Sequence, residues 1–311
     1  MQWKGVMPAM TTAFDSDMNV DHNFVARHAR WLVDNGCSGI VCLGSLGEAA
    51  TLGFGEKIAV LSTVVAAVAS RFPVVAAISA LSTAEAVSLA KAAEKSGVAG
   101  LMILPPYVYK GDWREMKAHI GAILNATKLE AMLYNNPVAY GTDFVPEQIA
   151  ELADEFPNLA AVKEPSTDVR RVTAIRALTG DRLAIFVGVD DAIVEGIAAG
   201  AVGWIAGLVN AMPRESVDLF NLAAGGRKQD AFELYRWFLP LLRMDTAPKF
   251  VQLIKQVQQE YRAGSARVRP PRLEVIGDEL AAVRAAVTFA QTHRPAIAAP
   301  STSFKVSSRQ S

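Results

Sequence analysis

The sequence predicts a (β/α)8 barrel of the α/β class with a helical extension at its C-terminal end. Eight short and nearly continuous apolar runs recur at even intervals over about the first 210 residues, as strands of a parallel sheet do when both faces are covered. Segments with helical periodicity lie between these runs. Farther along the chain only helical patterns follow.

Each apolar run is about as long as a strand, and we predict strands at 5–14, 38–44, 73–79, 99–106, 129–135, 159–165, 183–188 and 202–207. Helical periodicity predicts intervening helices at 56–72, 82–97, 111–127, 146–156 and 190–200. In the second of these, Ser82 and Glu85 have the spacing of a capping box, and Gly97 provides the stop. Strict alternation of this kind is typical of a closed barrel.

A doubly wound open sheet is the alternative fold. It usually has fewer strands and a glycine-rich first turn. The first turn here, "TTAFDSDMN", contains no glycine, which favours the barrel.

We therefore expect residues 1–225 to form the barrel and residues 226–293 to form the extension. The helical pattern at 213–226 should close the barrel, and the others lie at 228–244, 247–261 and 277–293. Residues 294–311 are rich in Pro and Ser without periodicity, which predicts a flexible tail.

Composition excludes several classes of function. The 311 residues carry a formal net charge of 0 and no basic run, which argues against a nucleic-acid partner. No uncharged stretch reaches the length of a transmembrane helix, and the N-terminus lacks the apolar core of a secretory signal. Cys37 and Cys42 lie near apolar runs, as core thiols in a reducing compartment do. We expect a cytoplasmic protein without a membrane partner. The four scattered histidines and the absence of CxxC or HxxxH predict no metal site.

In such a barrel the active site lies at the carboxyl ends of the strands. The sixth predicted strand ends in Lys163, which is either a solvated lysine at the rim or a nucleophile. In an apolar barrel mouth its pKa would be lowered, so that a neutral amine could attack a carbonyl group.

Three further strand ends carry polar groups or bare backbone. Tyr134 ends the fifth strand and is either a proton relay or a core aromatic side chain with a satisfied hydroxyl group. The "GSLG" turn after the second strand places Ser45 between two glycines whose N–H groups can face an anion. The seventh strand ends at Gly188, and Asp190 or Asp191 is expected to act as an N-cap. The "NNP" corner after Tyr134 should turn the chain away from the mouth, with its amides satisfying the backbone.

Four ordered motifs show a resemblance to a known family: "GSLGEAATL", "YNNP", "VKEPSTD" and "VGVDDAIVEGIAAGAVGWIAGLVNAMP". From about residue 4 to 293 the chain resembles the dihydrodipicolinate synthase / N-acetylneuraminate lyase superfamily of Schiff-base-forming lyases. The resemblance implies a barrel with a helical extension, a homo-oligomer that is usually a tetramer, and a small keto or imino acid substrate. It implies that Lys163 forms the covalent imine without a cofactor, that Tyr134 relays protons and that Ser45 is the first hydroxyl of the glycine-rich loop.

Three departures from the synthase pattern bear on the substrate. Leu46 replaces the second Thr of the loop, and Val108, between Tyr107 and Tyr109, replaces a Tyr that reaches a neighbouring subunit. Ala139 replaces an Arg. These changes argue against synthesis of dihydrodipicolinate from aspartate semialdehyde.

A subgroup, the 4-hydroxy-Δ1-pyrroline-2-carboxylate deaminases, resembles the chain more closely in the loop, in Val-Tyr after the fourth strand and in the late Arg-Pro-Pro-Arg, residues 269–272. The expected reaction is deaminating dehydration to 2,5-dioxopentanoate and ammonia. Alternatives are an aldolase or dehydratase of 2-keto-3-deoxy sugar acids, a dihydrodipicolinate synthase-like enzyme and a non-catalytic sensor barrel. Substrate contacts are expected from Gly44, Leu46, Gly47, Tyr109, Asn136, Tyr140, Gly188 and Ile205.

Overall fold

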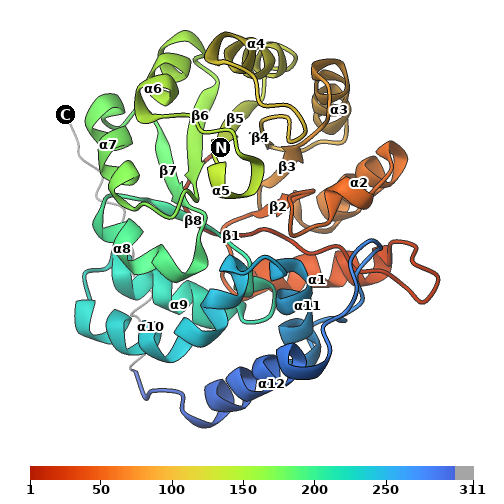
Figure 1. Cartoon of the computed structure of the whole chain (residues 1–311), viewed down its shortest axis with the longest axis vertical. Helices are drawn as coiled ribbons and strands as arrows, with labels where there is room; N and C mark the ends of the chain where they lie inside the picture. The colour runs from red at the N-terminus through yellow and green to blue at the C-terminus, as the bar shows by residue number, and fades with distance from the viewer. Residues whose placement is uncertain (298–311) are drawn as a thin grey trace.

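The computed structural model of the chain describes residues 1–297, so that most of the tail predicted at 294–311 lies outside the described residues. Eight parallel strands form one sheet in the order β1-β8-β7-β6-β5-β4-β3-β2, as Figure 1 shows. The strands are β1 (Gly5–Pro8), β2 (Ile40–Cys42), β3 (Val74–Ile78), β4 (Gly100–Ile103), β5 (Glu130–Tyr134), β6 (Leu159–Glu164), β7 (Ala184–Val187) and β8 (Gly203–Ala206).

The sheet closes between β1 and β2. A parallel bridge joins Ala9 to Val41, and the N–H groups of Ser38 and Met10 donate to the carbonyls of Val6 and Val41 at 2.8 and 2.9 Å. The strands are almost wholly buried because helices cover the outside and side chains fill the interior. The predicted (β/α)8 barrel is confirmed.

The helices around the barrel are α1 (His22–Asp34), α2 (Phe54–Val68), α3 (Thr83–Lys95), α4 (Trp113–Leu124), α5 (Pro137–Tyr140), α6 (Pro146–Glu155), α7 (Arg170–Thr179), α8 (Ile193–Ala198) and α9 (Pro213–Ala224). Ser82 caps α3, since its Oγ accepts from the Glu85 N–H at 3.2 Å. Among the described residues no bond from the Glu85 side chain back to the Ser82 N–H completes the predicted capping box. The sequence patterns did not single out α1 or α7. Helix α7 buries only Val172 and Ile175, which is too few apolar residues to give a clear periodicity.

The helical extension predicted at the C-terminal end is present. It contains α10 (Lys228–Leu242), α11 (Phe250–Glu260) and α12 (Gly277–Thr292), with the short 3₁₀ turn η4 (Arg243–Thr246) between α10 and α11. Figure 1 shows these helices gathered on the side of the barrel formed by α1, α8 and α9. The extension is tied to the barrel through Lys255 of α11, whose Nζ lies 2.8 Å from the carboxylate of Glu48 in a fully buried ion pair.

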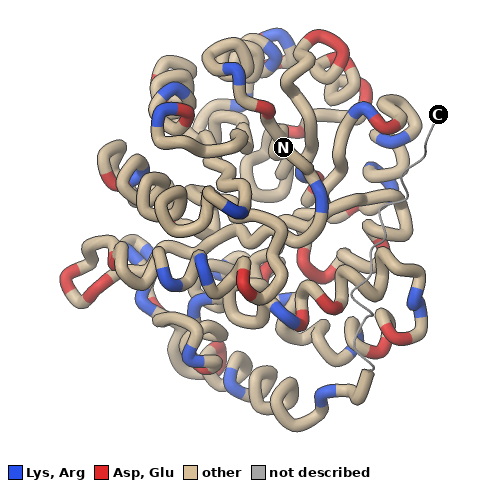
Figure 2. Tube along the Cα trace, turned by 180° about the vertical axis from the view of Figure 1, so that it is seen from behind, with Lys and Arg blue, Asp and Glu red and all other residues tan. Residues whose placement is uncertain are grey.

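Charged residues of both signs are interspersed on the helices, as the view from behind in Figure 2 shows. Among the described residues, no helix is both long enough and apolar enough to cross a membrane. Cys37 and Cys42 are buried and free, and burial raises the pKa of each thiol to about 12. Both are therefore unreactive core side chains, as the sequence indicated.

Candidate active site

Lys163 lies at the carboxyl end of β6 and points into the mouth of the barrel. Only 6% of its surface is exposed. Burial lowers the pKa of Lys163 to about 8, and attraction to Asp245 and Asp190 opposes this shift. The neutral amine, the form that attacks a carbonyl carbon, is therefore far more populated near neutral pH than in an exposed lysine.

Tyr134 is the direct cross-strand neighbour of that lysine, since β5 and β6 pair Tyr134 with Lys163. The ammonium nitrogen lies 4.2 Å from the centroid of the phenol ring. Burial raises the pKa of Tyr134 to about 12, while hydrogen bonds with Asn136, Ser45 and Tyr140 act in the opposite direction. A positive iminium on Lys163 would lower this pKa, because an opposite charge nearby favours the phenolate.

The hydroxyl groups of Ser45 and Tyr140 are in direct hydrogen-bond contact, and the rings of Tyr134 and Tyr140 meet edge to face with centroids 5.8 Å apart. Asn136 donates from Nδ2 to the Tyr134 hydroxyl at 3.1 Å. Three hydroxyl groups and an amide therefore form a continuous polar path on the β5 side of Lys163. Such a path can carry a proton away from the reacting carbon.

The loop after β2 is held in an unusual conformation. Leu43 and Glu48 have positive φ angles of 64° and 55°, which are rare for residues other than glycine and often occur at functional sites. Glu48 is fixed by Lys255 and by the Arg269 N–H at 2.9 Å. Within the described residues, the N–H groups of Ser45 and Leu46 donate no hydrogen bond, so both remain available for a substrate carboxylate.

A cavity of about 510 Å³ connects these groups. That volume suits a small organic acid. Nine of the residues predicted for catalysis or binding line it: Gly44, Ser45, Leu46, Tyr134, Asn136, Tyr140, Lys163, Gly188 and Ile205.

Two of the predicted contact residues do not line this cavity. Gly47 accepts a hydrogen bond from the Thr12 hydroxyl at 2.7 Å through its carbonyl oxygen, so it shapes the loop. Tyr109 is 56% exposed and bonds to Glu115 at 3.0 Å. Tyr107, two residues earlier, instead turns inward and stacks on Tyr140 with ring centroids 5.6 Å apart.

The expectation that Asp190 or Asp191 acts as an N-cap is wrong, since neither side chain caps the 3₁₀ turn η2 (Asp190–Ala192) or the helix α8. The side chain of Asp190 is fully buried. The carboxylate instead accepts from the Trp204 indole at 3.0 Å and from the N–H groups of Gly207 and Leu208 at 3.1 and 2.8 Å. Asp190 thus fixes the turn after β8, which borders the cavity.

The two asparagines after Tyr134, Asn135 and Asn136, form hydrogen bonds with different parts of the chain. Asn135 is fully buried, accepts from the Phe144 N–H at 2.9 Å and donates to Glu164 at 3.0 Å. Asn136 caps the short helix α5 through the Ala139 N–H at 3.0 Å. The expectation that these amides satisfy the backbone at the corner is confirmed for both.

The extension adds six residues to the cavity wall, among them Asp245, Phe250 and Arg272, and none of them was predicted from the sequence as a contact residue. Arg272 also borders a side pocket of about 260 Å³ together with Ser79 and Tyr107. Its Nη1 lies 4.0 Å from Glu48. The Arg-Pro-Pro-Arg pattern was a signal for Arg272, whereas nothing in the sequence around Asp245 marked it as part of a site.

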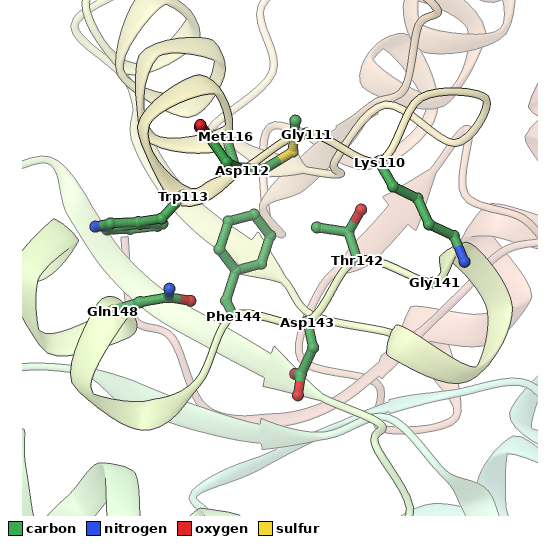
Figure 3. Close-up of a pocket in the computed structure, with 10 residues that line it drawn as sticks. All are labelled: Lys110, Gly111, Asp112, Trp113, Met116, Gly141, Thr142, Asp143, Phe144 and Gln148. Carbon is green, nitrogen blue, oxygen red and sulfur yellow. The ribbon is translucent and has the colours of Figure 1, made fainter.

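A separate cavity of about 120 Å³ lies between the start of α4 and residues 141–148, as Figure 3 shows. Lys110, Trp113 and Phe144 are among its lining residues. No residue predicted for catalysis borders it, so we place the chemistry in the larger cavity around Lys163.

Known proteins are similar to this chain over most of its length. The chain is 33% identical over 241 residues to the 4-hydroxy-tetrahydrodipicolinate synthase of Persephonella marina, covering 78% of this chain and 82% of that protein. It is 31% identical over 274 residues to the protein of the same name from Desulforudis audaxviator, covering 87% and 91%.

Solved structures give the same result. The 4-hydroxy-tetrahydrodipicolinate synthase from Methylacidiphilum fumariolicum SolV superposes with a TM-score of 0.90 at 26% identity, covering 93% of this chain and 96% of that one. The model of the Dihydrodipicolinate synthetase family matches residues 2–290. Because the family model matches nearly the whole length of the chain and relatives more than 30% identical cover most of it, the chain belongs to the dihydrodipicolinate synthetase family.

Proposed function

We propose that the protein catalyses the deaminating dehydration of 4-hydroxy-Δ1-pyrroline-2-carboxylate to 2,5-dioxopentanoate and ammonia. Enzymes of its family are lyases that form a Schiff base with a lysine and use no external cofactor. The observation that carries the proposal is the buried amine of Lys163 beside Tyr134 in one cavity. The chain segment that follows Tyr134, residues 135–140, contains no charged residue.

The lining of the cavity supports a compact substrate with a single carboxylate. Leu46 and Ala139 both face it, at positions where the synthases that the chain resembles have a hydroxyl group and a guanidinium. The free N–H groups of Ser45 and Leu46 would hold one carboxylate. 4-Hydroxy-Δ1-pyrroline-2-carboxylate has only one acidic group, so it does not need the arginine that Ala139 replaces.

The reaction would begin when the neutral amine of Lys163 attacks C2 of the ring. The C2–N bond to the ring nitrogen then breaks, which leaves an iminium on the lysine and a free amine at C5. The iminium withdraws electrons from C3, and the relay of Tyr134, Ser45 and Tyr140 removes a C3 proton. The 4-hydroxyl leaves as water.

The conjugated product then isomerises to an imine at C5. One water hydrolyses that imine and releases ammonia, and a second water cleaves the lysine imine and frees 2,5-dioxopentanoate. One water is formed and two are consumed, so the overall reaction uses one water for each ammonia released.

A dihydrodipicolinate synthase-like activity is the second candidate. It is favoured by the names of the relatives and by Arg272, which places a guanidinium in the cavity wall from the extension. A 2-keto-3-deoxy sugar acid aldolase or dehydratase would use the same lysine. A sensor barrel is disfavoured, since ligand binding alone does not need a nucleophilic amine beside a phenol.

Three assays on the purified protein separate the candidates: ammonia release from the pyrroline, pyruvate formation from keto-deoxy sugar acids, and condensation of pyruvate with aspartate semialdehyde. Borohydride with pyruvate should leave a mass adduct on Lys163, which Lys163→Ala should abolish. Tyr134→Phe should reduce kcat by about 10²–10⁴. Turnover only in the condensation assay would replace the deaminase by the synthase.

We also propose that the protein is a cytoplasmic homo-oligomer, with a tetramer as the expected state. The segments after β3, β4 and β5 expose Leu81, Val108, Tyr109 and Val138 by 56–78%. Large exposed apolar side chains near one another commonly mark a protein interface. Sedimentation at micromolar concentration should give a mass near four chains, and a monomer would contradict this.

A further inference from the structure

Asp245 enters the active-site cavity from the extension. It lies in η4, the turn that joins α10 to α11, and lines the same cavity as Lys163. Its carboxylate occupies the space next to Gly207, the first residue after β8. A Cβ at Gly207 would lie 2.0 Å from Asp245 Oδ1, so a side chain at residue 207 would push the carboxylate out of this position.

The partners of this carboxylate are few. Within the described residues, Asp245 forms no side-chain hydrogen bond or salt bridge, so that only longer-range attraction to Lys163 opposes its burial. The groups that face it are the Lys163 amine, which attracts it, and the carboxylates of Asp190 and Asp191, which repel it. Asp190, in contrast, accepts hydrogen bonds from three donors.

The environment favours the protonated form of Asp245. Burial, followed by repulsion from Asp190, raises the pKa of Asp245 well above its ordinary value, and Lys163 only partly opposes this. A neutral carboxylic acid in an active site can donate a proton at a pH where an exposed aspartate cannot.

Asp245 and the phenol relay reach the cavity from different parts of the barrel, although the charge of Asp245 also acts on Tyr134. In the sheet order β8-β7-β6-β5, Lys163 is on β6, Tyr134 is on β5 and Gly207, beside Asp245, follows β8. An elimination needs two proton transfers, because one proton leaves a carbon and another must reach the departing oxygen. The cavity provides a separate group for each transfer.

We propose that Asp245 is a catalytic proton donor, which protonates the hydroxyl group that leaves from the carbon β to the iminium carbon. The phenol relay first removes a proton from the α carbon, and the C–H electrons form an enamine. The enamine electrons then form the bond between the α and β carbons, the β C–O bond breaks, and the oxygen takes the proton of Asp245. Water departs, Asp245 is left as a carboxylate, and the lysine nitrogen is again an iminium.

This inference deepens the proposed function and rests on its elimination step. It also narrows the substrate class, since it applies to any 2-oxo or imino acid with a hydroxyl group on the β carbon. It does not apply to a condensation that lacks such a leaving group.

The test compares Asp245→Asn with the wild-type enzyme on two substrates that differ only in the leaving group: the 4-hydroxy pyrroline and its 4-fluoro analogue. Fluoride departs without needing a proton from an acid. With the hydroxy substrate the variant should lose about 10²–10⁴ of kcat. With the fluoro substrate, product formation should stay close to the wild-type rate, and borohydride trapping of pyruvate on Lys163 should be unchanged.

A structural role would give another result. If Asp245 only positions Lys163, both substrates and the trapping reaction should slow by the same factor, and that outcome overturns the proposal. An unchanged kcat on the hydroxy substrate overturns it as well. Asp230→Asn is the matched control, because Asp230 lies in the same extension on the surface of α10 and pairs with Arg227; it should behave as the wild type does.

A second pair of substrates distinguishes a failure of the proposed deaminase activity from a failure of the proposed role of Asp245. The same comparison is made with 4-hydroxy-2-oxobutanoate and its 4-fluoro analogue, which need no ring opening. A wild-type enzyme that releases no ammonia from the pyrroline refutes the deaminase. The hydroxy-to-fluoro ratio of the linear substrates then decides the role of Asp245, and a wild-type enzyme that eliminates neither leaving group overturns that role too.

Discussion

Replacing Gly188 by alanine tests whether the absence of a side chain at residue 188 leaves the space that Lys163 needs. A Cβ at Gly188 would lie 2.5 Å from Cε and 2.9 Å from Cγ of Lys163, and 2.9 Å from Cβ of Pro165. Carbon atoms that are not bonded prefer a separation of about 3.5–4.0 Å. The lysine side chain must therefore move by about 1 Å in the Gly188→Ala protein.

The size of the effect follows from this displacement. A misplacement of about 1 Å in a reacting group can reduce the rate by about 10². We therefore expect imine formation on Lys163 and turnover to fall together by about 100-fold. Overpacking should also lower the free energy of unfolding by about 1–3 kcal/mol, which leaves the protein folded at room temperature.

The assay is single-turnover trapping with pyruvate and borohydride, followed by the mass of the peptide that contains Lys163. Circular dichroism on the same samples reports whether the protein is folded. Gly55→Ala is the matched control, because a Cβ at Gly55, in the first turn of α2, would meet no atom within 4 Å. This control should trap pyruvate at the wild-type rate. A folded Gly188→Ala protein that does the same would refute the argument that Lys163 needs this space.

Three further predictions concern the pKa of Lys163, the buried Lys255–Glu48 ion pair and the space at Gly207. Burial lowers the pKa of Lys163 to about 8, so the neutral amine accumulates as the pH rises. The rate of pyruvate trapping should therefore increase about tenfold per pH unit up to about pH 8 and then level off. A trapping rate that still increases beyond pH 10 would contradict a lowered pKa. Lys255→Met leaves Glu48 buried without its 2.8 Å partner, and urea titration should show a loss of about 3–5 kcal/mol in the free energy of unfolding, whereas an unchanged midpoint would show that the pair is not needed. Gly207→Ala should displace Asp245, whose Oδ1 would lie 2.0 Å from the new Cβ, and should slow elimination of water more than trapping of pyruvate; equal slowing of both would contradict this.

The eight strands could be predicted because they are local features. Each is a short apolar run, and the observed strands all fall within the predicted runs. The helix around Pro240 was also predicted despite the proline in its last turn, since the apolar spacing on either side is kept. Lys163 and Tyr134 could be recognised because both end a strand, and the ends of parallel strands in a barrel meet at one mouth.

The surroundings of these two side chains depend on contacts between distant residues. Lys255 meets Glu48 across 207 positions of the chain, and this pair holds the loop that carries Ser45. Asp245 reaches the cavity only because α10 and α11 fold back over the barrel. No periodicity or motif encodes such contacts, since they arise from the packing of whole elements.

The sequence by itself therefore determined the barrel, the extension and the lysine–tyrosine pair, because strand length, apolar spacing and strand-end chemistry are written in neighbouring residues. Tertiary structure alone decided that Asp190 fixes the turn after β8, that Tyr107 and not Tyr109 turns inward, and that Asp245 and Arg272 join the cavity. The physical reason is burial. The enclosing fold removes most of the water from Lys163 and part of it from the half-buried Asp245, and this shifts the pKa of each toward its neutral form.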